Sequence, residues 1–136
     1  MPLGTTVMES LSGRLFGVYR IVEPLGAGGM ASVYKAYQPS VDRYVALKIL
    51  PSQLAKDPGF LARFEQEAKM LANFQHPHIL PVHDFGESDG FTYIVMPFIK
   101  TGTLAAHLRG RPLPLEQIRR VITQIGDALD CAHTQG

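Results

Sequence analysis

Three features of this sequence have the residue types and spacing that phosphate chemistry needs. Six of the seven residues from Gly26 to Ser32 are small, so backbone N–H groups there can approach phosphate oxygens closely. Lys48 follows in an apolar run and offers a cation. Glu67 follows in a second apolar pattern and offers a carboxylate to pair with it. Each feature alone is a weak signal, but the three in this order predict a nucleotide site.

The context of the glycines separates two common kinds of phosphate loop from a third. A dinucleotide-binding loop leads into a helix, whereas Ser32–Tyr37 has the composition of a strand. The Gly-Lys-Ser/Thr signature of a P-loop is also missing after these glycines. A loop between two strands is instead typical of the glycine loop of protein kinases.

Three short β-type runs should position the loop and the lysine. They are Tyr19–Leu25, Ser32–Tyr37 and Tyr44–Leu50, separated by turn-forming residues, and they predict an antiparallel meander. Strand alternation in the third run places Lys48 on the same face as Ala46. The opposite face should carry the apolar residues Val45, Leu47 and Ile49.

A helix should carry Glu67. Asp57 is the expected N-cap, Pro58 occupies the first helical position, and the helix should end near Asn73. Glu67 falls in the apolar stripe that begins at Phe60, so its carboxylate needs a partner inside the protein.

The rest of the chain predicts two more strands and two helices. The strands are expected around Leu80–Asp84 and Phe91–Met96, with a turn centred on Asp89-Gly90. A short helix is expected over Leu104–Leu108, and Pro114 opens a long helical pattern.

These features together resemble the N-terminal lobe of a protein kinase, most closely a bacterial eukaryotic-like (Hanks-type) serine/threonine kinase. The resemblance implies an α+β fold with a five-stranded antiparallel sheet and one helix, followed by a hinge and the first two helices of the helical lobe. It implies a flexible leader over 1–14, an ATP-binding lobe over 15–96, a hinge over 97–103 and the start of the helical lobe over 104–136. The motifs that carry it are Gly28-Gly29-Met30-Ala31-Ser32-Val33-Tyr34-Lys35-Ala36, Val45-Ala46-Leu47-Lys48, Phe64-x-x-Glu67-Ala68, His76-Pro77-His78-Ile79-Leu80 and Tyr93-Ile94-Val95-Met96.

The resemblance also implies a role for each site residue. Lys48 would hold the α- and β-phosphates of ATP, and Glu67 would orient Lys48. Met96 matches the gatekeeper, and Pro97 stands where an acidic residue is common. The adenine would be enclosed by Leu25, Val33 and Ala46. The hinge would be Pro97, Phe98 and Ile99, with the backbone of Ile99 bonding to adenine. The residues that would cover the triphosphate are Gly26, Ala27, Gly28, Gly29, Met30, Ala31, Ser32 and Val33.

The kinase pattern stops at Gly136, before the His-Arg-Asp loop that supplies the catalytic base. Asp84-Phe85-Gly86 spells the magnesium-binding motif, but it precedes the gatekeeper, and we interpret it as a strand end and turn. Mg²⁺ is expected for the complete family, while its ligands are absent here. The predicted function is therefore the ATP-binding part of a kinase that phosphorylates a protein substrate, with no activity from this chain alone. The alternatives are a non-catalytic, pseudokinase-like module that binds a nucleotide or a partner, and an incomplete gene product.

Composition excludes several other classes. Thirteen Lys and Arg against twelve Asp and Glu give a net charge of +1 with no basic patch, which argues against nucleic acid. The longest apolar run is too short for a membrane segment. The single cysteine, Cys131, fits a cytoplasmic protein. Three histidines, His76, His78 and His83, lack metal-ligand spacing and are interpreted as structural.

The last helix should carry an unusually apolar face. Its residues Ile118, Val121, Ile122, Ile125 and Leu129 recur at helical spacing. Left uncovered, such a face favours association, so we expect self-association through it.

Overall fold

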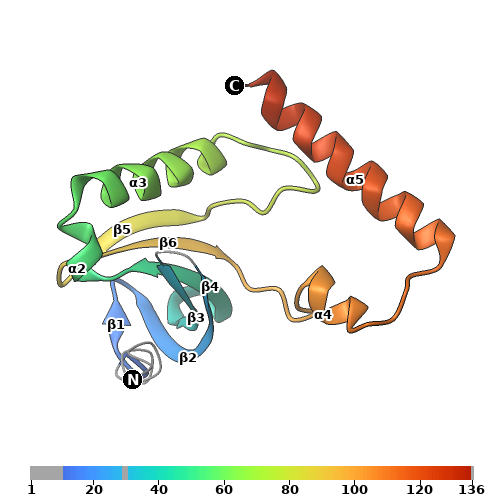
Figure 1. Ribbon diagram of the computed structural model, residues 1–136. Coiled ribbons are helices and arrows are strands. Elements are labelled where there is room, and N and C mark those ends of the chain that lie inside the picture. Colours follow the sequence, from blue (N-terminus) through green and yellow to red (C-terminus); the bar gives the residue numbers. More distant parts are fainter. Residues whose placement is uncertain (1–10, 29–30, 136) are drawn as a thin grey trace. The chain divides into compact units, whose positions relative to one another are not determined.

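The computed structural model describes residues 11–28 and 31–135 (Figure 1). The chain forms two compact units, one running up to Asn73 and including Pro81–Phe98, the other comprising Phe74–Leu80 and Ile99 onward. The elements are β1 (Leu15–Phe16), β2 (Tyr19–Gly28), β3 (Ala31–Gln38), the 3-10 helix η1 (Pro39–Val41), β4 (Arg43–Leu50), α2 (Ser52–Ala55), α3 (Pro58–Ala72), β5 (Asp84–Ser88), β6 (Phe91–Pro97), α4 (Leu104–Leu108) and α5 (Leu115–Thr134).

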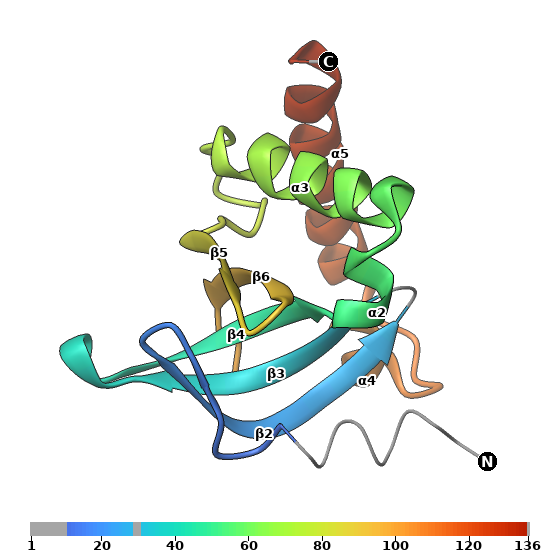
Figure 2. The same ribbon diagram turned by 90° about the vertical axis from the view of Figure 1, so that its left-hand side faces the viewer.

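The first unit is built on one antiparallel sheet in the order β1-β2-β3-β4-β6-β5. Its long strands β2, β3 and β4 curve together (Figure 2). The α+β architecture agrees with the sequence, and the two-residue β1 adds a sixth strand to the five expected. Pairing of Phe16 with Tyr19 is too short to leave an alternating pattern in the sequence.

One strand was predicted in the wrong place. The strand expected over Leu80–Asp84 begins only at Asp84 and runs to Ser88, so Asp84-Phe85-Gly86 begins a strand rather than ending one. The turn is shorter than expected, because Asp89 and Gly90 both have positive φ angles, 51° and 82°. This two-residue turn pairs Ser88 with Phe91 and leaves residues 86–88 inside the ladder.

The sheet has an apolar core on one face, which we call the core face. Val45, Leu47 and Ile49 of β4 are 0–1% exposed, as the alternation predicted. Each fully buried aliphatic side chain contributes about 1.5–3 kcal/mol. Leu11 is buried in this same core, and Gly13 donates a backbone hydrogen bond to Ile21 O at 2.8 Å. The remaining core residues are Phe16, Tyr19, Ile21, Tyr34, Ala36, Tyr93 and Val95.

Helix α3 packs against the opposite face, which we call the Lys48 face. Phe64 and Ala68 of α3 are buried in a cluster with Leu50 and Ile94 of the sheet. The helix begins as expected, since Asp57 Oδ1 accepts a 2.8 Å hydrogen bond from Gly59 N–H and Pro58 fills the first position. It lies beside β5 in both views (Figures 1 and 2).

The second unit contains α4 and α5, whose positions agree with the predicted ranges. Thr103 caps α4 by accepting a 3.1 Å hydrogen bond from Ala106 N–H. Among the residues described, no helix is long and apolar enough to cross a membrane.

Candidate functional site

Lys48 and Glu67 meet in the structure. Lys48 Nζ donates a 2.7 Å hydrogen bond to Glu67 Oε1, which joins the middle of β4 to α3. The lysine side chain is 27% exposed and the glutamate side chain 45%, so the pair is reachable from solvent. The carboxylate fixes the ammonium in one position, and the charge of that ammonium remains available to an anion. The pair agrees with the inward faces predicted for both residues and with the role that the kinase resemblance implied for Glu67.

Strand register places the predicted nucleobase residues in adjoining rows with Lys48. Val33 of β3 stands opposite Lys48, and Lys48 stands opposite Ile94 of β6. Two pairs along, Ala46 stands opposite Met96. Directly opposed residues share a face of the sheet. The small side chain of Ala46 and the branched side chain of Val33 therefore flank Lys48 on one surface.

The glycine-rich segment forms the hairpin between β2 and β3. Gly26 pairs with Val33 and Gly28 with Ala31, while Gly29 and Met30 lie outside the described residues. A Cβ added at Gly26 would meet nothing within 4 Å, so the protein itself does not require a glycine there.

The other predicted residues of this hairpin differ in exposure. Leu25 is 44% exposed, whereas Ala31 is buried in the cluster under α3. Ser32 pairs with Ala27 across the hairpin. Leu25 is thus open to a ligand, while Ala31 anchors the returning strand.

The predicted hinge begins where β6 ends. Pro97 is the last residue of β6 and has no N–H to donate. Phe98 is half-buried, and its ring lies 4.8 Å from Lys35 Nζ. Ile99 is 50% exposed and belongs to the second compact unit.

The aspartate of Asp84-Phe85-Gly86 lies on the face of the sheet opposite Lys48. Asp84 is opposite Val95, whose side chain is buried in the core, so this carboxylate belongs to the core face. It accepts hydrogen bonds from Phe85 N–H at 2.8 Å and from the Tyr19 hydroxyl at 3.1 Å. Burial, together with this hydrogen bond, raises the pKa of Tyr19 to about 12. Asp84 therefore serves the fold on the core face, whereas Phe85 stands opposite Ile94 and belongs to the Lys48 face.

The remaining acidic residues and histidines are the candidate magnesium ligands. Within 11–28 and 31–135, no group of three or more His, Cys, Asp or Glu side chains is placed to hold a metal ion. The donor set around Lys48 is a single carboxylate, Glu67, which is already paired. The described residues therefore supply no Mg²⁺ site made of protein ligands alone.

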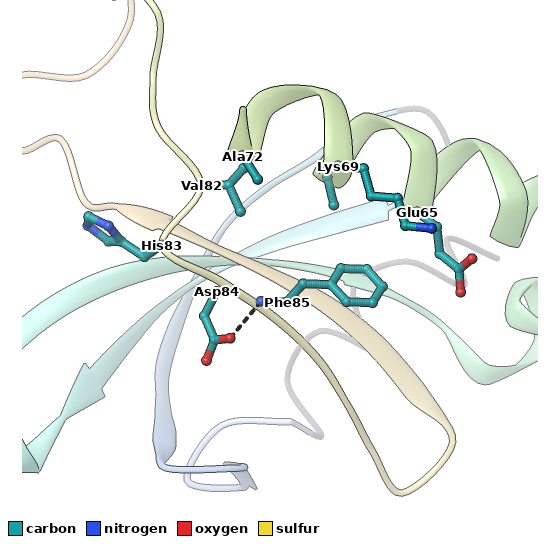
Figure 3. Close-up of a pocket in the computed structure, with 8 residues that line it drawn as sticks. Glu65, Lys69, Ala72, Val82, His83, Asp84 and Phe85 are labelled. Carbon is teal, nitrogen blue, oxygen red and sulfur yellow. Dashed lines mark hydrogen bonds between the residues drawn. The ribbon is translucent and has the colours of Figure 1, made fainter. Parts of the chain in front are cut away.

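A cavity of about 400 Å³ lies between α3 and the start of β5 (Figure 3). On the helix side, the cavity is lined by residues of α3 that are three or four positions apart and share one face. Glu67 lies on a different face of the helix. Figure 3 shows the Phe85 ring under the helix, while His83 points away from it. Burial lowers the pKa of His83. The cavity is lined by Glu65, Ala68, Lys69, Ala72, Val82, His83, Asp84 and Phe85, none of which was predicted as a site residue.

Lys35 shares a face with the site, although no sequence motif assigned it a role there. Lys35 stands directly opposite Ala46, and it follows Val33 by two residues on the same strand. Alternation from Val33 would have placed it on the Lys48 face. The aromatic neighbours of Lys35 are Tyr44 and Phe98, which come from distant segments, so no local sequence pattern predicts these contacts.

Comparison with known proteins gives consistent matches. Residues 19–136 match the family model described as the protein kinase domain. The serine/threonine-protein kinase PknE of Mycobacterium bovis is 43% identical over 129 residues, covering 94% of this chain and 23% of PknE. PknJ of Mycobacterium tuberculosis is 41% identical over 128 residues, covering 94% and 22%.

Solved structures agree with the sequence matches. The crystal structure of the Mycobacterium tuberculosis PknI kinase domain superposes with a TM-score of 0.76 at 37% identity. It covers 92% of this chain and 51% of the PknI domain. The chain therefore spans about half of that solved kinase domain and less than a quarter of the curated relatives.

Proposed function

This chain belongs to the protein kinase family, and on that premise we propose that it is the ATP-binding part of a serine/threonine protein kinase. The observation that carries the proposal is the 2.7 Å ion pair between Lys48 and Glu67. The pair holds a cation on an accessible face, next to a hairpin of small residues. In a complete kinase, this arrangement helps transfer the γ-phosphoryl group of ATP to a protein hydroxyl.

We assign the roles within the nucleotide site as follows. Lys48 binds the α- and β-phosphates, and Glu67 keeps the lysine in position. The open space at Gly26 supports close approach of a phosphate to the hairpin. Adenine lies against Leu25, Val33 and Ala46, with Met96 behind it and the backbone of Ile99 as its hydrogen-bond partner. Gly28 to Ser32 complete the cover over the phosphates.

A second candidate function is a non-catalytic module that binds a nucleotide or a partner protein. It is favoured by the position of Asp84, the only aspartate of an Asp-Phe-Gly sequence in this chain, on the face opposite Lys48. Phosphoryl transfer needs metal charge and a base that positions the hydroxyl. We therefore expect a polypeptide of these 136 residues to bind ATP without transferring its phosphate.

Nucleotide binding is tested by titrating ATP into the wild-type chain and two variants. Lys48→Met removes one charge-assisted contact and should weaken ATP binding by about 10- to 100-fold. Gly28→Val should weaken it by obstructing the hairpin. Lys56→Met removes an exposed lysine outside the site and should bind as wild type does. Equal affinity in the wild-type, Lys48→Met and Gly28→Val chains would show that the site is misassigned.

We further propose that the apolar face of α5 mediates self-association. Ile118, Ile122, Ile125 and Leu129 recur at spacings of four, three and four residues and are 37–64% exposed. Exposed apolar surface of this kind favours association. Sedimentation velocity should show dimers of the wild-type chain that dissociate in an Ile122→Lys variant, with Arg120→Lys as control. A wild-type chain that stays monomeric at high concentration would contradict this.

A further inference from the structure

Lys35 occupies a cage built from three other segments of the chain. Its Nζ lies 4.4 Å from the centre of the Tyr44 ring and 4.8 Å from the centre of the Phe98 ring. Glu23 Oε1 lies 4.0 Å away on the neighbouring strand. The lysine side chain is only 22% exposed. Cations within about 6 Å of a ring centre are attracted to its face, so both rings and the carboxylate hold this ammonium.

The cage connects the sheet to the segment that follows Pro97. Lys35 projects from the middle of β3 opposite Ala46, and Tyr44 lies near the start of β4. Phe98 is the first residue after β6. Pro97, opposite Val45, is the last residue of this segment that pairs with β4. The ring of Phe98 is thus attached to the sheet by Lys35 at the point where regular pairing stops.

We infer that Lys35 is a positioning residue for the base end of the nucleotide site, because it holds the ring of Phe98 and thereby the backbone that contacts the nucleobase. This inference rests on the proposed function. Two features separate it from a role at the phosphates. The ammonium already has Glu23 and two ring faces as partners, and Lys35 stands opposite Ala46 rather than opposite Lys48, whose partner on β3 is Val33. Its effect should therefore fall on adenine and spare the phosphates.

The experiment compares two ligands, ATP and inorganic tripolyphosphate, in the full chain. Lys35→Met keeps the length of the side chain and removes its charge. It should weaken ATP binding by about three- to tenfold, as expected for the loss of two cation–ring contacts, and leave tripolyphosphate binding unchanged. Lys35→Arg should restore ATP binding, because a guanidinium also stacks on aromatic rings. Thermal melts should show similar midpoints for all three chains.

A double-mutant cycle tests whether the effect passes through Phe98. Phe98→Leu alone should weaken ATP binding to a similar extent, and adding Lys35→Met to it should cause little further loss. Additive losses would overturn the inference, because they would show that the two residues act separately. Lys56→Met, which removes an exposed lysine outside the cage, serves as the matched control.

The remaining outcomes distinguish this inference from the function on which it rests. ATP binding by the wild-type chain that Lys35→Met leaves unchanged would overturn the positioning role alone. Equal losses of ATP and tripolyphosphate affinity in Lys35→Met would also overturn it, since Lys35 would then act on the phosphates. Failure of the wild-type chain to bind ATP at all would overturn the proposed function, and the positioning role with it.

Discussion

The two faces of the sheet are made from alternate residues of the same strands, but they are covered very differently. On β4, Val45, Leu47 and Ile49 are 0–1% exposed and lie in the larger core. Between them, Lys48 points to the other face with 27% of its side chain exposed. The core face is closed by Leu11 and Phe16, whereas the Lys48 face is only partly covered by α3.

This difference divides folding and binding between neighbouring residues. The core face gains its free energy from buried apolar area, which needs no ligand. The Lys48 face holds a lysine, a carboxylate and a caged cation, all of which keep polar atoms near the surface. Substitutions on the two faces should therefore separate stability from nucleotide affinity, even at adjacent positions.

The largest contrast is expected between Leu47 and Lys48. Leu47→Ala removes a fully buried side chain and should lower the free energy of unfolding by about 2–5 kcal/mol. Lys48→Met should change it by less than about 1 kcal/mol, because partly exposed ion pairs contribute little. Urea denaturation of both variants measures the difference. If Lys48→Met were the more destabilising, the ion pair would be a folding element and the division of the two faces would be wrong.

Gly86 and Gly26 should show the same contrast between the two faces, with a smaller difference in the free energy of unfolding. A Cβ at Gly86 would lie 2.6 Å from the Tyr93 hydroxyl, so Gly86→Ala should destabilise the protein by about 1–3 kcal/mol. A Cβ at Gly26 meets nothing, and Gly26→Ala should leave stability unchanged or raise it by up to about 1 kcal/mol.

Ligand titration completes the glycine comparison. Gly26→Ala should weaken ATP binding, since the methyl group occupies the side from which a phosphate approaches the hairpin. Titration of ATP at matched temperature, with chemical unfolding of the same samples, separates the two effects. Normal ATP affinity in Gly26→Ala would remove Gly26 from the site.

The parts of this molecule that were predictable from sequence are those determined by local periodicity. Alternation along β4 assigned Leu47 and Lys48 to opposite faces. The stripe containing Phe64 assigned Glu67 to the inside of α3, and Asp57 with Pro58 marked the start of that helix. The Lys48–Glu67 pair followed because each inward-facing charge needed a partner.

The features missed by sequence reasoning depend on tertiary contacts. The position of β5 depends on a turn of only two residues, Asp89 and Gly90. The same sequence is equally compatible with a longer Gly-rich turn. Glu65 and Lys69 of α3 line a cavity whose other wall comes from residues 82–85, a segment distant in the sequence. The aromatic cage of Lys35 joins Tyr44 and Phe98, which are far apart in the sequence, and no single segment contains its pattern.

Alkaline pH should weaken the core face through Tyr19. The pKa of this phenol rises from 10.0 to about 12 on folding, chiefly by burial, so the folded state holds its proton more tightly. The contribution is fully present below pH 10 and is lost as the pH rises from 10 to 12, by up to about 2 kcal/mol. Unfolding experiments across this range should show the loss.

A Tyr19→Phe variant isolates this contribution. It should lose less stability between pH 10 and 12 than the wild-type chain does. Some loss should remain, because burial also raises the pKa of Tyr34 and Tyr93. Parallel pH curves for the two chains would mean that folding does not raise the pKa of Tyr19.

The smallest effect should come from the cap of α3, and it should fall on the Lys48 face. Asp57→Ala removes the acceptor of the Gly59 N–H and should lower stability by about 1 kcal/mol. Asp57→Ser keeps an acceptor and should restore it. Since α3 carries Glu67, hydrogen exchange in Asp57→Ala should accelerate along α3 and leave the amides of Leu47 and Val95 protected. Acceleration spread evenly over both regions would instead mean that α3 and the core face unfold as one unit.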